Sequence, residues 1–218
     1  MVDSVYRIVD TDYMMAVATL GTRDRLVATA RDYLDAEGLE GIGLREIARR
    51  AGLSHGAPLR HFPTLGRLLA AVAAEGFRDL HASVTHALAP IDPNAALERL
   101  AAAAYGYVHF AANNPGVFGL MFRADLCDTD DPEYATEGSA AFGQLVELVV
   151  DAQACGFHPT LPPAELAGVL WSTMHGLASL HLHGALAPTT GQIDLDALVR
   201  LANLLAFGVS TSAPEGTP

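Results

Sequence analysis

Arginine and histidine side chains gather in one short stretch of this 218-residue sequence, and they are groups suited to binding phosphate. Five Arg lie between residues 41 and 67, where Glu46 is the only acid, and His55 and His61 lie in the same stretch. The five are Arg45, Arg49, Arg50, Arg60 and Arg67. Guanidinium groups bind phosphate oxygens, and they also read base edges in the major groove of DNA. We therefore expect residues 41–67, the basic stretch, to contact a polyanion.

The rest of the chain is acidic. The sequence holds 13 basic residues, all Arg, against 25 Asp and Glu, which gives a formal net charge of −12. A basic island on an acidic body suits a protein that touches a polyanion with one end only. Chance clustering of five Arg on a helical surface is the alternative, and charge alone does not separate the two.

Short helices are expected to position these basic side chains. Apolar residues at helical spacing predict helices over 23–37, 44–51 and 55–62, with a longer helix from residue 65. Thr22, Ser54 and Thr64 are expected N-caps, and Gly52 is expected to end the second helix with a positive φ. Three short helices of this spacing form a helix-turn-helix. His55, Gly56, Pro58 and Arg60 are expected to face outward, towards a major groove.

The remaining sequence predicts an all-α fold. Ala and Arg are frequent and β-branched residues are sparse. Further helices are expected over 95–112, 116–123, 139–155, 163–183 and 195–209, with an acidic loop over 125–137. The expected organisation is a flexible tail (1–21), a helix-turn-helix domain (22–82), a helical effector-binding and dimerisation domain (83–209) and a disordered tail (210–218).

No secretion signal or membrane-spanning run is evident, and Cys127 and Cys155 fit neither a disulfide framework nor a metal site. These features favour a cytoplasmic protein without a metal or a cofactor. Motifs typical of hydrolases and phosphate-binding enzymes are not found either, so we expect no catalytic activity.

The helix-turn-helix resembles that of the tetracycline-repressor-like (TetR) family of bacterial regulators. Its matching elements are Ile47-Ala48, Ala51-Gly52-Leu53-Ser54, Gly56-Ala57 and His61-Phe62, all at the family's separations. The resemblance implies double-stranded operator DNA as the partner. The DNA-binding residues that it implies are Arg45, Ser54, His55, Gly56, Ala57, Arg60 and His61. Leu59 and Leu65 depart from the pattern, because the family usually has Tyr and a basic residue there. Two phosphate contacts are therefore expected to be missing.

A second match lies downstream, where Trp171, His175 and Gly176 resemble the Trp-His-Gly motif of one branch of the family. That resemblance implies a ligand-responsive regulator, most simply a repressor, that is released from DNA by a small effector. Few charges lie nearby, which favours an apolar or aromatic effector. The expected effector-binding residues are Tyr105, His109, Phe118, Met121, Phe122, Trp171, Met174 and His175. A plain apolar core is the alternative for this set.

The two C-terminal helices carry small and apolar residues that could form a symmetric four-helix interface between two copies. A homodimer would present two recognition helices to successive major grooves, about 34 Å apart. The competing hypothesis, motivated by Leu59 and Leu65, is an all-helical small-molecule-binding protein or enzyme with a degenerate DNA-binding head.

Overall fold

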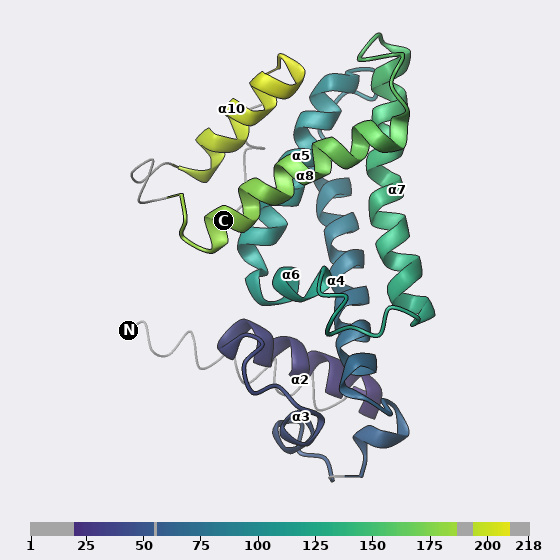
Figure 1. Cartoon of the computed structure of the whole chain (residues 1–218), viewed down its shortest axis with the longest axis vertical. Coiled ribbons are helices and arrows are strands. Elements are labelled where there is room, and N and C mark those ends of the chain that lie inside the picture. Colours follow the sequence, from purple (N-terminus) through teal and green to yellow (C-terminus); the bar gives the residue numbers. More distant parts are fainter. Residues whose placement is uncertain (1–19, 55, 187–193, 210–218) are drawn as a thin grey trace. The chain divides into compact units, whose positions relative to one another are not determined.

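The computed structural model describes residues 20–54, 56–186 and 194–209. Every regular element within these ranges is helical, which confirms the all-α prediction (Figure 1). The predicted tails (1–21 and 210–218) lie wholly or almost wholly outside the described residues, as does His55. None of the described helices is long and apolar enough to cross a membrane.

The elements follow the sequence in this order: α2 (Thr22–Glu37), α3 (Leu44–Arg50), the 3-10 helix η1 (Pro58–Arg60), α4 (Leu65–Leu88), α5 (Ala96–Asn113), α6 (Pro115–Met121), α7 (Pro132–Ala154), α8 (Pro163–Leu182) and α10 (Leu195–Phe207). The chain forms two compact units. The first, which we call the head, consists of Met1–Glu75 with Gly116–Ala135, and the second, which we call the body, consists of Gly76–Pro115 with Thr136–Pro218. The predicted domain boundaries stay a prediction.

The head is built around α2, which packs against α3 and η1 (Figure 1). Leu26 and Val27 of α2 and Ile47 and Ala48 of α3 are fully buried, and Phe62 is 4% exposed. Burial of these residues removes apolar surface from water, which is the main force that holds such a small module together. Arg25 of α2 also donates a hydrogen bond to the Ala51 carbonyl, which fixes the end of α3.

The third helix of the head differs from the prediction. A helix over 55–62 was expected, but the structure has only the single 3-10 turn η1, capped by Ala57 and not by the Ser54 side chain. Pro58 explains the difference, because an α-helix capped by Ser54 needs the amide of residue 58 to bond to the Ser54 carbonyl, and Pro has no N–H. The Ala57 amide donates a hydrogen bond to the Ser54 carbonyl instead, at 3.0 Å. Pro58 itself is buried, although it was expected to face outward.

Two other boundaries differ from the predictions. The acidic loop was expected to reach residue 137, but α7 already begins at Pro132 because an Asp131 carboxylate oxygen accepts the amides of Glu133 and Tyr134, at 3.0 and 3.2 Å. The first predicted helix begins at Thr22 itself, with Gly21 as its N-cap. The predicted positive φ of Gly52, at 65°, and the Thr64 cap, which accepts the Arg67 amide at 3.2 Å, are confirmed.

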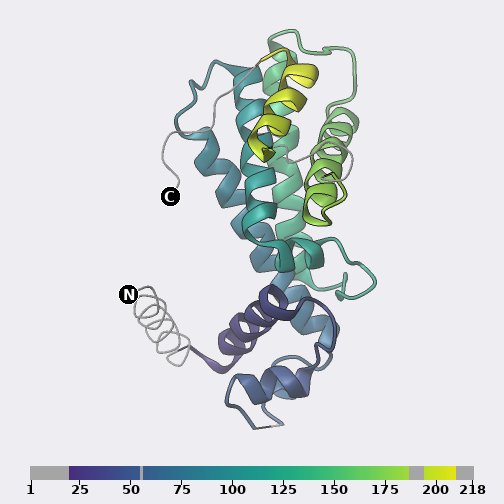
Figure 2. The ribbon, with the colours of Figure 1, turned by 90° about the vertical axis from the view of Figure 1, so that its left-hand side faces the viewer.

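The body is organised around the alanine-rich helix α5, against which both α8 and α10 pack (Figure 2). Small side chains let the neighbouring helices approach closely. Gly106 of α5 shows this, since a Cβ added there would lie 3.0 Å from the Val84 Cα. The buried Asn203 of α10 donates to the Ala101 carbonyl at 3.0 Å and ties α10 to the middle of α5.

Candidate nucleic-acid interface

The surface of the head around η1 carries exposed basic groups. Arg60 and His61, at the end of η1, are exposed, and so is Arg45 in the first turn of α3. Neither Arg45 nor Arg60 has a hydrogen bond or ion pair with any described residue. Leu59, which precedes Arg60 in η1, is 60% exposed and offers no hydroxyl. These two guanidinium groups are therefore available to phosphate oxygens or base edges.

Two other arginines of the basic stretch are neutralised locally. Arg49 and Arg50 both donate to the Glu46 carboxylate, with nearest N–O distances of 2.6 and 2.7 Å. Arg50 also pairs with Glu37 at 2.5 Å. The hydrogen bonds from Arg49, which has the larger effect, and from Arg50 lower the pKa of Glu46 to about 2. Because the Glu46 carboxylate is ionised near neutral pH, these two arginines contribute less to the attraction of a polyanion than the sequence suggests.

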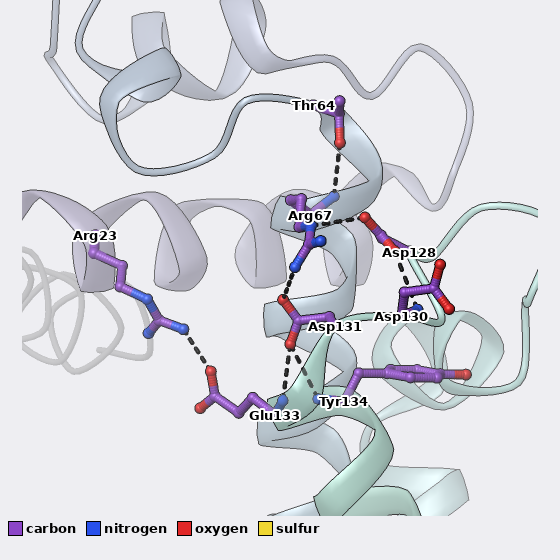
Figure 3. A network of polar contacts seen from close by, with 8 residues as sticks. All are labelled: Arg23, Thr64, Arg67, Asp128, Asp130, Asp131, Glu133 and Tyr134. Carbon is purple, nitrogen blue, oxygen red and sulfur yellow. Dashed lines mark hydrogen bonds and ion pairs between the residues drawn. The ribbon is translucent and has the colours of Figure 1, made fainter.

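Arg67, the last arginine of the stretch, is held by the acidic segment that leads into α7 (Figure 3). Its guanidinium bonds Asp128 at 2.7 Å and Asp131 at 3.1 Å. Arg23 of α2 bonds Glu133 at 2.6 Å, and its guanidinium carbon lies 5.6 Å from the centre of the Phe62 ring. Within the basic stretch, Arg45 and Arg60 thus differ from the other three arginines in having no acidic partner among the described residues.

The remaining predicted DNA-binding residues lie in the segment of the head that leads into η1 or directly follows it. Ser54 and Gly56 are exposed, and Ala57 is half-buried. His55 lies outside the described residues. The contacts of Ser54, Gly56, Ala57 and His61 with DNA stay a prediction.

The predicted effector-binding residues divide between the two units. Tyr105, His109, Trp171, Met174 and His175 belong to the body, and Phe118, Met121 and Phe122 belong to the head. Phe118 and Met121 are buried, and the Phe118 and Phe122 rings meet edge to face with centroids 5.4 Å apart. An effector-binding role for these eight residues stays a prediction.

Trp171 and His175 lie four residues apart on one face of α8, and both contact Tyr107 of α5. The Trp171 indole donates to the Tyr107 hydroxyl at 3.0 Å, and that hydroxyl lies 2.7 Å from His175 Nδ1. Burial raises the pKa of Tyr107 and lowers the pKa of His175, so both are neutral near pH 7. The Trp171 N–H donates to the Tyr107 hydroxyl, and the tautomer of His175 sets which group donates in the bond between Tyr107 and His175 Nδ1.

A second polar contact joins α5 to the start of α10. His109 Nε2 lies 2.7 Å from an Asp196 carboxylate oxygen, and the Tyr105 hydroxyl donates to the Asp196 carbonyl at 3.3 Å. The Tyr105 and His109 rings stack with centroids 5.3 Å apart. Both residues, which were predicted to bind an effector, therefore already position α10 on α5.

Sequence reasoning missed the acids that neutralise the arginines. Glu46 stands three and four residues before Arg49 and Arg50, a spacing that brings the groups together on a helix, so that pairing had a visible signal. The pairing of Arg67 with Asp128 and Asp131 joins residues more than 60 positions apart and had no such signal. Tyr107 likewise meets Trp171 through tertiary packing alone.

Comparison with known proteins agrees with this architecture. Residues 26–72 match the family of bacterial regulatory proteins described as the tetR family, and residues 100–203 match the tetracyclin repressor-like C-terminal domain. An uncharacterized HTH-type transcriptional regulator of Mycobacterium tuberculosis is 27% identical over 186 residues, which cover 83% of this chain and 80% of that protein.

Solved structures show the same fold. A protein of unknown function from Rhodococcus sp. RHA1 is 30% identical with a TM-score of 0.75, over 88% of this chain and 97% of the other. A tetR-family regulatory protein from Rhodococcus RHA1 is 23% identical with a TM-score of 0.66, over 90% and 100% of the two chains. With a family match at each end, a helix-turn-helix head and an all-helical body, the chain belongs to the TetR family of bacterial regulatory proteins and is a transcriptional regulator.

Proposed function

We propose that the protein represses transcription by binding a palindromic operator as a homodimer, and that a small effector releases it. The observation that carries the proposal is the state of Arg45 and Arg60, which are exposed and have no ion-pair partner among the described residues. Arg60, the last residue of η1, and His61, which follows it, would contact the major groove and the DNA backbone along it, and Arg45 would contact a phosphate. The site of action would be the cytoplasm.

The proposed dimer interface consists of the exposed apolar faces of α8 and α10. Val169 and Leu180 of α8 are 63% and 49% exposed. Leu201, Leu204 and Leu205 of α10 are 53%, 49% and 80% exposed. Apolar residues exposed together on two long helices are typical of a surface that a partner covers. A second copy would bury them in a four-helix arrangement, as the sequence predicted.

The proposed effector site centres on Tyr107, Trp171 and His175. This cluster combines aromatic surface with neutral hydrogen-bonding groups that are partly withdrawn from water. Such a site favours a ligand with aromatic or other apolar surface and one polar group, and it disfavours a highly charged one. Titration of intrinsic fluorescence can detect such a ligand, because Trp171 is the only Trp in the sequence.

Fluorescence anisotropy with a labelled duplex from the region flanking the protein's own gene tests the DNA-binding proposal. We expect salt-sensitive binding that exceeds binding to a random duplex, and we expect Arg60→Ala to reduce that preference. Arg123→Ala is the matched control, since Arg123 belongs to the same unit, is exposed and pairs with the nearby Asp125 at 2.7 Å. Equal affinity for both duplexes, or equal effects of the two variants, would contradict the assigned role of Arg60.

A further inference from the structure

The acidic segment before α7 belongs to the DNA-binding head, although it comes from the middle of the sequence. Gly116–Ala135 forms a compact unit with Met1–Glu75. Residues 20–75 contain eight Arg and seven Asp or Glu, whereas Gly116–Ala135 contributes one Arg and five acids. Among the described residues of the head, this segment therefore changes the formal net charge from +1 (eight Arg, seven acids) to −3 (nine Arg, twelve acids), which opposes the approach of a polyanion.

The acids of this segment lie against the first turn of α4. The Asp128 amide donates to the Gly66 carbonyl at 3.1 Å, which places the backbone of the segment beside the first turn of α4. Asp128 and Asp131 then each give one carboxylate oxygen to the Arg67 guanidinium (Figure 3). The side chain of Arg67 is still 36% exposed, so solvent and ions reach it.

Each of the two carboxylates also has a structural role that does not need its charge. The other oxygen of Asp128 accepts the Asp130 amide at 3.1 Å. The other oxygen of Asp131 accepts the amides of Glu133 and Tyr134 at the start of α7. An Asn side chain retains one carbonyl oxygen for those bonds, so the charges can be removed without removing the turn.

We propose that Arg67 is a further DNA-phosphate-binding residue and that Asp128 and Asp131 compete with DNA for it. The first turn of a helix is a favourable place for a phosphate contact, because its free amides and the helix dipole add to the attraction. Arg67 lies there, in the first turn of the helix that follows η1 in the sequence, and it belongs to the same unit as the exposed Arg45 and Arg60. The acidic segment thereby sets an upper limit on DNA affinity, and neutralising it releases one phosphate contact per head. The inference rests on the proposed DNA-binding function.

The test is a double variant, Asp128→Asn with Asp131→Asn, titrated against a labelled random-sequence duplex over a range of NaCl concentrations. A random duplex suffices because a phosphate contact does not depend on sequence. One added contact steepens the plot of log affinity against log salt by about 0.9 per head. At physiological salt this corresponds to binding about fivefold tighter per head, or roughly 25-fold for a dimer.

Two further variants separate the proposed contact from a general charge effect. Glu40→Gln with Asp130→Asn removes two exposed charges from the same unit without touching the pairs of Arg67 and without releasing another arginine. We expect a gain well below that of the first variant. Adding Arg67→Ala to Asp128→Asn and Asp131→Asn is expected to abolish the gain.

An equal gain in the control pair, or a gain that survives Arg67→Ala, would overturn the inference. The inference would also be overturned if the wild type binds DNA and the double variant binds it no more tightly, a result that leaves the proposed function intact. Binding by neither protein would contradict the proposed function as well. Binding by the double variant alone would support the inference.

Discussion

Gly116→Ala is expected to destabilise the head, because α6 touches α2 at this glycine with no room for a side chain. A Cβ at Gly116 would lie 2.5 Å from the Leu34 carbonyl carbon and oxygen and 2.8 Å from the Asp35 nitrogen. All three are backbone atoms of α2, so no flexible side chain can yield. Restoring ordinary contact requires the two helices to separate by about 1 Å, in a region packed as closely as a crystal.

The magnitude follows from the cost of overpacking, which is about 1–3 kcal/mol for one inserted methyl group. We expect the upper part of that range, because the Asp35 carboxylate also accepts the amides of Gly116 and Val117, and separation would weaken both bonds. Gly119→Ala in the same helix is the matched control. No atom lies within 4 Å of a Cβ at Gly119, so replacing the flexible glycine should stabilise the protein by up to about 1 kcal/mol.

Urea denaturation followed by circular dichroism, at one fixed protein concentration, measures both variants. We expect a lower urea midpoint for Gly116→Ala and an unchanged or higher midpoint for Gly119→Ala. Shifts of the same sign and size in the two variants would refute the reasoning, since they would show that the close approach at Leu34 carries no cost.

Three further predictions concern single residues of the head and the body. A carboxyl-detected NMR titration should place the pKa of Glu46 at about 2, below the usual 4.5, and a midpoint near 4.5 would contradict its pairing with Arg49 and Arg50. Because the pKa is lowered in the folded state, these pairs stabilise the fold above about pH 4.5 and lose that contribution as the pH falls towards 2. Tyr107→Phe removes the acceptor of the Trp171 N–H, so it should lower the free energy of unfolding by about 1 kcal/mol and shift the fluorescence emission of Trp171. Unchanged stability and emission would count against the hydrogen-bonded cluster. Leu205→Glu places a charge on the proposed interface and should convert dimer to monomer in analytical ultracentrifugation, whereas Val150→Glu, at an exposed apolar position of α7, should not. A dimer that persists in Leu205→Glu would exclude the α10 face from the interface.

Most elements of the fold could be predicted from local pattern, and the main exception has a local cause. The helices around Leu26, Ile47 and Leu100 follow from apolar residues that recur at helical spacing, and all three are buried. The third helix of the head was predicted over 55–62, which is too long, because the apolar spacing does not register the missing amide of Pro58. That amide would have made the first hydrogen bond of the helix, so its absence leaves a single 3-10 turn.

The candidate site was predictable in its location and less so in its charges. The family motif located η1, and the clustering of arginines located the basic stretch. The sequence did not indicate that Asp128 and Asp131 would reach Arg67, because that pairing depends on how the segment before α7 packs against α4. The same holds for His109, whose bond to Asp196 requires α10 to lie along α5.

In the proposed complex, two heads of a dimer contact DNA through their η1 segments. Hydroxyl-radical footprinting on the bound duplex tests it most directly. We expect two protected backbone patches that are related by a two-fold axis and centred about one helical turn of DNA, or a whole multiple of it, apart. Protection of each patch is expected to be weaker in Arg45→Ala. A single patch, or a protection pattern that Arg45→Ala leaves unchanged, would contradict it.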